Sequence, residues 1–371
     1  MPWTWGAALL AGAWQAANLV SFASHTHDDV YISLRYADHL AAGAGFVFNP
    51  GERVEGASNA LWVFILAGAR MAGLDPLTTA KWLGAILVLT IPWLEFRFAG
   101  RMSAGRAGAT AAWLTVMSPA MAFWAVNGME TGAYAFLVTL SLLLAAGDLQ
   151  RSAGWPRAVP AFCAASLMRP EGMLLAMPYL FLLTWRARSG KVSWRKTIWA
   201  SAGLLGCAGA TAAARWLYFG VPVPNTFFVK VEQQALWSTG SGLAYLVHYG
   251  RDSGAFVWVP LALGSALAAV RESGHPATLL AGALACQIAF IQLTGGDWMP
   301  AGRFIVPVLP AAHLLAGDGA ARLWRAWGRG RKEASVAVAA MLAGGALTFG
   351  LAVRERAIVV PIARAYTRGL E

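Results

Sequence analysis

The sequence predicts an all-α, polytopic transmembrane helical bundle, and two observations lead to this fold class. Hydrophobic residues make up 58% of the 371 residues and charged residues only 13%, whereas soluble domains carry about 25% charged residues. The apolar residues also form long runs that are separated by short links rich in Arg, Lys, Gly and Pro. A helix satisfies its own backbone hydrogen bonds in lipid, so we expect these runs to be membrane-spanning helices.

We expect about 11 spans, each of about 20 residues where the run is complete. The candidate spans are Trp3–Phe22, Leu77–Phe96, Ala107–Val126, Thr131–Gly147, Val159–Met168, Gly172–Trp185, Thr197–Tyr218, Ala255–Val270, Pro276–Thr294, Phe304–Leu323 and Ala334–Val353. Two of them, Val159–Met168 and Gly172–Trp185, are short, so neighbouring links must contribute to them. The run Ala60–Leu74 is also short and contains Arg70. It is either a thin span or a helix that lies along the interface.

Basic residues orient these spans. If Ala60–Leu74 does not cross, the dense clusters Arg186–Lys196 and Arg322–Lys332 fall on one side of the membrane. The positive-inside rule places that side in the cytoplasm, with the N-terminus inside. The first span lacks a basic n-region, so we expect it to be retained. The net charge of +11 therefore reflects membrane topology, and nucleic acid is not an expected partner.

The links on the opposite side carry mixed polar residues together with Gly and Pro. They are the first loop (residues 24–76), Asn127–Thr131, Arg169–Gly172, Val221–Lys230 and Gly295–Arg303. We expect a single transmembrane domain over residues 1–371, with interfacial helices in the first outer loop and no soluble C-terminal domain. The expected location is a bacterial inner membrane, with these polar links on the extracytoplasmic face.

The adjacent carboxylates Asp28 and Asp29 are the sharpest functional signal. They follow directly on the first span, in a loop that holds five of the chain's 18 acidic residues. Carboxylates at the mouth of an apolar cavity can act as a general base, as metal ligands, or as stabilisers of positive charge. They can also simply cap the helix that we expect from Val30 to Leu40. Two of them beside several polar motifs favour the functional interpretation.

The same loop offers cationic and metal-binding candidates. On the expected helix, Tyr31, Arg35 and Asp38 share one face within about one turn, so Arg35 could bind a lipid phosphate or pair with its own acids. His25 and His27 extend the motif to H-x-H-D-D. Because no distant third ligand set is visible, we favour polar interface residues over a histidine metal site. A divalent metal on the two aspartates stays open.

The other outward links hold isolated charged residues. Glu130 precedes a span, where a helix N-terminus suits a carboxylate. Arg169 and Glu171 stand at a break between two apolar segments, where charges are usually functional or paired with each other. Asp297 and Arg303 bracket a Gly/Pro turn in the same way, and Asn225 and Lys230 could contact a phosphate or a sugar. Each is weak alone, and together they indicate one polar site.

These motifs resemble the GT-C superfamily of polytopic glycosyltransferases. The resemblance runs in order from D-D-V-Y-I-S-L-R-Y-A through G-F-V-F-N-P-G-E-R-V-E-G-A-S-N, N-G-M-E-T, R-P-E-G and P-N-T-F-F-V-K to G-G-D-W-M-P-A-G-R-F. Within the superfamily the chain looks most like the branch that contains the terminal β-(1→2)-arabinofuranosyltransferase, which uses decaprenyl-phosphate-arabinose. In that branch a soluble carbohydrate-binding domain often follows the membrane part, and this chain departs from that pattern.

The resemblance implies an inverting transferase that moves a sugar from a polyprenyl-phosphate carrier to a glycan, lipid or protein acceptor outside the cytoplasm. It places the catalytic base at Asp28 or Asp29. The residues expected to bind substrate are Arg35, Tyr36, Asn49, Glu52, Glu55, Asn59, Glu130, Arg169, Glu171, Asn225, Lys230, Asp297 and Arg303. The alternative is a transporter or lipid-linked sugar flippase, but the sequence has no visible internal repeat and its outward charges cluster at one face.

Overall fold

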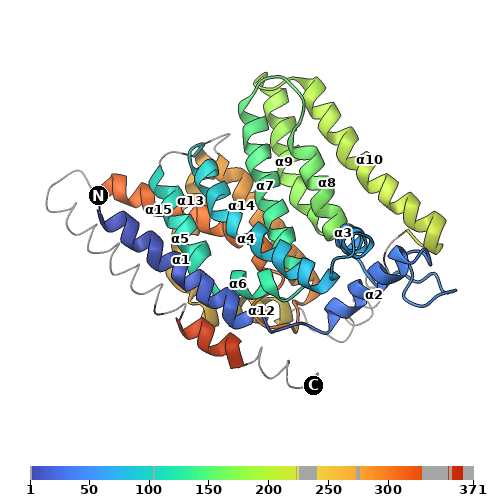
Figure 1. Cartoon of the computed structure of the whole chain (residues 1–371). Coiled ribbons are helices and arrows are strands. Elements are labelled where there is room, and N and C mark those ends of the chain that lie inside the picture. Colours follow the sequence, from blue (N-terminus) through green and yellow to red (C-terminus); the bar gives the residue numbers. More distant parts are fainter. Residues whose placement is uncertain are drawn as a thin grey trace.

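The computed structural model describes residues 2–102, 105–222, 224, 240–272, 276–327, 350 and 353–361. Over these ranges the chain is helical or irregular and has no strand, as the sequence predicts. The helices pack into one bundle (Figure 1), in which α6 is buried throughout and α7 for most of its length, while α4 and α14 are each buried on one side only. The predicted span Ala334–Val353 and the predicted site residues Asn225 and Lys230 lie outside the described residues.

The first half of the chain forms seven helices. They are α1 (Pro2–Phe22), α2 (Asp29–Ala41), α3 (Ala60–Met71), α4 (Pro76–Ala99), α5 (Gly105–Met117), α6 (Pro119–Val126) and α7 (Thr131–Gln150). Local sequence signals set several starts. Asp75 caps α4 by accepting a hydrogen bond from the Thr78 backbone N–H at 2.8 Å, and Pro76 opens the helix, because proline lacks the N–H that a first turn leaves unpaired.

The second half continues the bundle. Its helices are α8 (Ala158–Met168), α9 (Gly172–Arg188), α10 (Trp194–Phe219), α12 (Gly240–Ser253), α13 (Val259–Arg271), α14 (Pro276–Thr294), α15 (Leu309–Trp327) and a helix at 353–361, with single 3-10 turns at Ala255–Val257 and Val306–Val308. α14 has the bounds that the sequence predicts. α12 was not predicted, because its Gly and polar residues interrupt any apolar run.

Four described helices are long and apolar enough to cross a bilayer, namely α4, α7, α10 and α14. A fifth span arises if α5 and α6 are counted as one bent pair. α3 is apolar but has only 12 residues, which at ~1.5 Å per residue covers well under the ~30 Å of a hydrocarbon core. The structure therefore favours an interfacial helix over a thin span for this segment.

The predicted span Ala107–Val126 is not one straight helix. It breaks between α5 and α6 with a bend of 60°. Ser118 at the break has an extended backbone, and its side chain accepts a hydrogen bond from the Met121 backbone N–H at 3.5 Å. Because Pro119 disfavours helical geometry at Ser118, the S-P pair ends one helix and starts the next. The bend turns α6 toward the polar end of the bundle.

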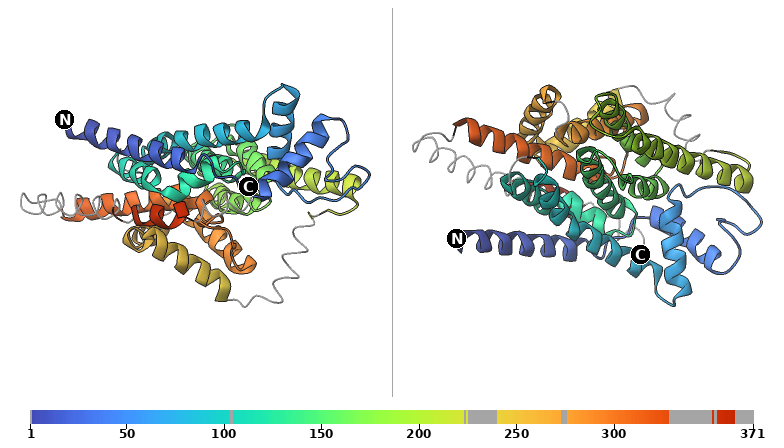
Figure 2. Two further views of the ribbon diagram at one scale, coloured as in Figure 1. Left: turned by 60° about the horizontal axis from the view of Figure 1, so that its bottom comes forward. Right: turned by 90° about the horizontal axis from the view of Figure 1, so that it is seen from above.

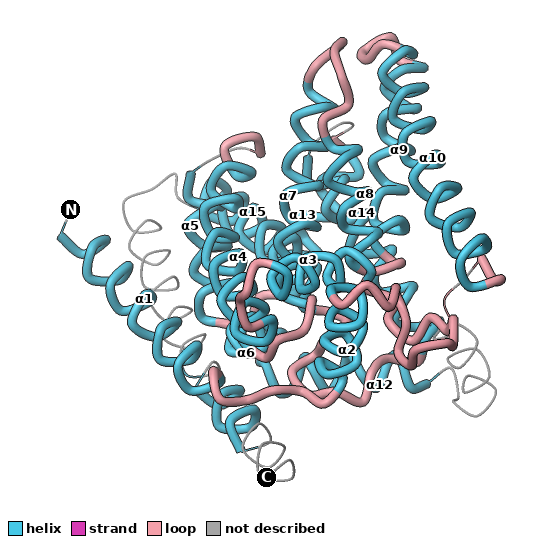
Figure 3. The backbone as a smooth tube through the Cα atoms, turned by 45° about the vertical axis from the view of Figure 1, so that its right-hand side comes forward, coloured by secondary structure: helices cyan, strands magenta, loops and turns pink. Residues whose placement is uncertain are grey.

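The N-terminus of α1 lies at one end of the molecule, and α2 and α3 lie at the opposite end (Figure 2). The longest loop of the described ranges, between α2 and α3, and the turns next to α6 gather at that polar end (Figure 3). Close packing fixes the turn after α6 there, because a Cβ at Gly84 of α4 would come within 2.1 Å of the Ala125 carbonyl oxygen. Small residues allow such helix contacts in membrane proteins.

Candidate active site

Glu130 is the centre of the outward polar residues. It lies in the turn between α6 and α7, and only 2% of its side chain is exposed. Asn59 donates its Nδ2 hydrogen to Glu130 Oε2 at 2.9 Å, and Arg169 Nη1 donates to Oε1 at 2.8 Å. Arg303 Nη2 donates to the same Oε1 at 3.2 Å. Three links that are far apart in the sequence therefore meet on one buried carboxylate.

Arg169 holds two carboxylates together at the break between α8 and α9. Its backbone is extended (φ −153°, ψ 133°), as the following Pro170 requires. The guanidinium donates from Nη1 to Glu130 and from Nε to Glu171, and its side chain is only 9% exposed. The Arg169–Glu171 pair anticipated from the sequence is present, and Glu130 is a second partner.

The turn at residues 295–303 aims Arg303 into this cluster. Gly296 and Gly302 have positive φ angles of 92° and 61°. A Cβ at Gly302 would lie 2.5 Å from Tyr249 Cδ2, and one at Gly296 would lie 2.8 Å from Tyr245 Cβ. Only glycine suits both the backbone angle and the space, so the turn lies tightly against α12.

The two aspartates have different surroundings. Asp28 caps α2 by accepting a hydrogen bond from the Asp29 backbone N–H at 3.0 Å, and its Oδ1 lies 2.7 Å from His27 Nδ1. Asp29 instead faces the cluster, with Oδ2 at 3.9 Å from Arg303 Nη1. Asp297 Oδ2 lies 3.6 Å from the same nitrogen. Asp28 thus fits the capping interpretation, and Asp29 joins the charged site.

The surroundings shift the pKa values of the two carboxylates in opposite directions. Burial on its own would raise the pKa of Glu130, but Arg303, Arg169 and the Asn59 hydrogen bond outweigh it and hold the pKa at about 2. Burial raises the pKa of Asp29 from 3.8, and the opposing pull of Arg303 is too weak to cancel it. Glu130 is therefore a permanent anion, whereas Asp29 is the group that can exchange a proton.

Asp29, Glu130, Glu171 and Asp297 together face only the two guanidinium groups of Arg169 and Arg303, so the described cluster has an excess of negative charge. A metal could reduce this excess. One ligand atom each from His27, Asp28 and Asp29 lies within 4.8 Å of the others. Imidazole and carboxylate ligands of this kind suit a divalent cation.

Four of the predicted substrate residues lie outside this cluster and stabilise the first outer loop. Arg35 donates to Asn49 Oδ1 at 3.0 Å, and Asn49 Nδ2 donates to Glu52 Oε2 at 3.2 Å. Tyr36 is fully buried, and its hydroxyl donates to the Val54 carbonyl at 2.6 Å. These contacts hold the loop in shape. A direct role for these side chains in binding substrate stays a prediction.

Glu55 ties the same loop to α10. Both of its carboxylate oxygens accept from Arg215 Nε at 3.0 Å, and the Glu55 side chain is 2% exposed. The sequence analysis missed Arg215 because it lies within the predicted span Thr197–Tyr218. The available signal was its charge in an otherwise apolar run, since such residues usually have a partner.

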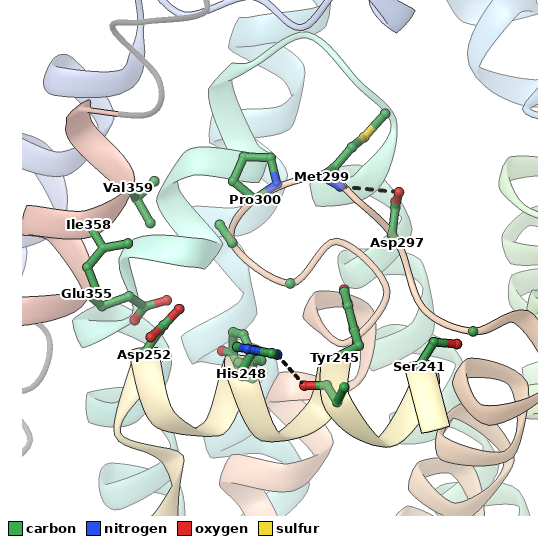
Figure 4. A pocket seen from close by; sticks show the side chains of 15 residues that line it. Ser241, Tyr245, His248, Asp252, Asp297, Met299, Pro300, Glu355, Ile358 and Val359 are labelled. Atoms are coloured by element: carbon green, nitrogen blue, oxygen red, sulfur yellow. Dashed lines mark hydrogen bonds between the residues drawn. The ribbon is translucent and has the colours of Figure 1, made fainter. Parts of the chain in front are cut away.

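Two cavities lie next to the cluster. The first has a volume of about 650 Å³, and the predicted neighbours Tyr31, Arg35 and Asp38 line it together with Asp28 and Arg70. The second has a volume of about 410 Å³ and lies between α12, the turn at residues 295–302 and the helix at 353–361 (Figure 4). The first cavity therefore borders Asp28, and the second borders Asp297.

Two curated proteins are similar to this chain in sequence. A terminal β-(1→2)-arabinofuranosyltransferase of Mycobacterium tuberculosis is 31% identical over 265 residues, which are 64% of this chain and 39% of that protein. The protein of the same name from Corynebacterium glutamicum is 24% identical over 326 residues, 76% of this chain and 46% of that protein. The chain thus spans less than half the length of the relatives it matches. No family model matches it.

Solved structures identify the fold. ArnT from Cupriavidus metallidurans bound to undecaprenyl phosphate aligns with 99% of this chain and 75% of its own, at 17% identity and a TM-score of 0.55. AglB from Archaeoglobus fulgidus, in complex with an inhibitory peptide and a dolichol-phosphate, aligns with 94% of this chain and 55% of its own, at 13% identity and a TM-score of 0.57. The chain has a GT-C fold. The resemblance predicted from its motifs is confirmed, and the chain is a multi-pass membrane protein.

Proposed function

We propose that this chain is a GT-C glycosyltransferase that moves a sugar from a polyprenyl-phosphate carrier to a hydroxyl group of an acceptor at the extracytoplasmic face. The names of its relatives make arabinofuranose the first sugar to test. The observation that carries the proposal is the meeting of Asp29, Glu130, Arg169 and Arg303 at one end of the bundle. It provides a base next to cations, as transfer from a lipid phosphate requires.

Asp29 is the proposed general base. It takes the proton of the acceptor hydroxyl while that oxygen attacks the anomeric carbon, and the bond between this carbon and the phosphate oxygen breaks. The electron pair stays on the phosphate, which leaves on its polyprenyl chain. Burial keeps the pKa of Asp29 above its usual value, so the carboxylate is more basic than a fully solvated one.

Arg303 and Arg169 are the proposed partners of the departing phosphate. Glu130 fixes both guanidinium groups before substrate arrives, so little reorganisation is needed as charge develops. His27, Asp28 and Asp29 would hold a divalent cation, which when bound neutralises negative charge beside the donor. Lys230 is the other proposed source of positive charge. Inversion at the anomeric carbon stays a prediction, and NMR of the anomeric proton in donor and product measures it.

The proposed orientation places the site outside the cytoplasm of a bacterial inner membrane. It rests on the basic links, such as the one around Arg188, at the end of the bundle away from the site. A cysteine at the exposed position Glu52 should react with an impermeant thiol reagent in intact cells, and one at Arg188 should react only after permeabilisation. The reverse pattern contradicts the orientation.

Transfer is tested with the purified protein in proteoliposomes, radiolabelled decaprenyl-phosphate-arabinose and an arabinofuranoside acceptor. We expect labelled product from the wild type and from Glu272→Gln, which alters an exposed carboxylate outside the cluster that pairs with Arg322. Asp29→Asn should lower turnover at least a hundredfold. Normal turnover by Asp29→Asn contradicts the proposed base. Movement of the donor between leaflets without product would favour the flippase alternative.

A further inference from the structure

The 410 Å³ cavity beside α12 differs chemically from the rest of the site. The described residues that line it include His248, Asp252, Asp297 and Glu355 but no Arg or Lys. The larger cavity is also lined by three aspartates, but Arg35 and Arg70 are there as well. Among the described residues beside α12, a phosphate would meet only negative or neutral groups, so the smaller cavity is the less suited to the charged end of the donor.

Glu355 shows that this cavity is built for a polar ligand. Its side chain lines the cavity, and the residue is only 4% exposed. Its Oε1 has no hydrogen-bond partner among the described residues, and a buried polar atom left unpaired costs about 1–3 kcal/mol. Figure 4 shows the Glu355 and Asp252 carboxyl groups pointing toward each other at the edge of the cavity. An incoming hydroxyl group would satisfy Oε1.

The remaining walls suit a sugar ring. Tyr245 and Tyr249 of α12 line one side, and Ile358 and Val359 of the helix at 353–361 line another. Aromatic and aliphatic walls with a few placed polar groups are typical of small-molecule sites, whose volumes are about 300–1,000 Å³. Burial, with a contribution from Asp252, also raises the pKa of Glu355 to about 8. A neutral carboxyl group can both donate to and accept from hydroxyl groups.

We propose that this cavity binds the uncharged sugar residue that accepts the transferred group, with Glu355 and Asp252 as hydrogen-bond partners of its hydroxyl groups. The inference rests on the proposed transferase function and adds the acceptor's class, a neutral glycan. The reacting hydroxyl reaches the charged cluster past Asp297, which lines the cavity and lies 3.6 Å from Arg303.

The test uses the full chain in nanodiscs and two probes, an uncharged arabinofuranosyl disaccharide glycoside and decaprenyl phosphate. Glu355→Leu removes the polar atoms at similar size, and Glu272→Leu is the control at an exposed carboxylate. We expect Glu355→Leu to weaken disaccharide binding at least tenfold in calorimetry and to leave decaprenyl phosphate binding within twofold. The Tm is measured in parallel and should fall only modestly, because the Glu355 carboxyl group also accepts a hydrogen bond from the Ala120 backbone, and the loss of one such bond is a small cost.

Several outcomes overturn the inference. They are unchanged disaccharide binding in Glu355→Leu, an equal loss for both probes, and no binding of the disaccharide by the wild type. A lower Tm with unchanged binding would assign Glu355 a structural role and overturn it as well. Asp252→Asn repeats the test without removing Glu355, with the same expected direction. If the wild type binds the disaccharide at this cavity but transfers nothing to it, the proposed transfer reaction fails and the binding site stands.

Discussion

Glu130→Gln is the most informative change at the charged cluster, because it removes one charge and keeps the shape. The carboxylate accepts hydrogen bonds from Arg169 at 2.8 Å and Arg303 at 3.2 Å while 2% exposed. Breaking a buried ion pair by removing one partner costs about 3–5 kcal/mol. We assume that about 3 kcal/mol of this cost raises the free energy of the transition state. Since each ~1.36 kcal/mol lowers the rate tenfold, kcat/KM should fall about a hundredfold.

The pH profile gives this prediction a second readout. Without Glu130, the remaining carboxylates near Arg303 are Asp29 at 3.9 Å and Asp297 at 3.6 Å. The guanidinium then acts more strongly on Asp29 and lowers its pKa, so the acid limb of kcat/KM should move to lower pH. The assay measures transfer from decaprenyl-phosphate-arabinose over about five pH units, from about pH 4 to about pH 9, with Glu272→Gln as the control. Wild-type kcat/KM and an unmoved acid limb in Glu130→Gln would refute the reasoning.

Three further predictions concern the base, the metal and the first loop. The pKa of Asp29 is raised and a base works ionised, so wild-type transfer should fall as the pH drops through that raised pKa. Asp28→Asn, which changes the cap of α2, should lower transfer about tenfold and move the acid limb to lower pH, because the charge of Asp28 helps to raise the pKa of Asp29. Chelation with EDTA should lower transfer, and added Mn²⁺ should restore it. If the wild type is fully active in EDTA and Lys230→Gln is inactive, the positive charge near the phosphate comes from Lys230 and not from a metal. Glu55→Gln breaks the buried ion pair with Arg215 that joins the first loop to α10. The loop at residues 43–58 should then be cleaved by protease at least tenfold faster, with little change in Tm. Equal cleavage of mutant and wild type would contradict this role of the ion pair.

Much of the site was visible in the sequence, because membrane topology sorts residues by face. Asp29, Glu130, Arg169 and Arg303 follow or precede apolar runs, and alternation of the runs places their links on one side. Membrane topology does not determine which of these links contact one another. The sharing of one Glu130 oxygen by two arginines depends on helix packing, such as the contact of Gly84 with the Ala125 carbonyl.

The parts that the sequence misplaced have local physical causes. α12 lacks the continuous apolar run that marks a span, so its role as a wall of the second cavity was invisible. The bend after α5 depends on Ser118 and Pro119, a short signal inside a strongly apolar stretch. Arg35, Asn49 and Glu52 bond to one another or to the nearby loop backbone, and the sequence alone does not show these contacts; their role in binding substrate stays a prediction.

The charged side chains of the central cluster come from four separate stretches of the chain, around positions 29, 130, 169 and 303. A polypeptide that has inserted only its first helices has Asp29 but not its partner Arg303. One that lacks the turn before α15 still lacks Arg303, which pairs with Glu130. The complete cluster therefore forms late, once nearly the whole polypeptide is in the bilayer, and a partly inserted molecule lacks it.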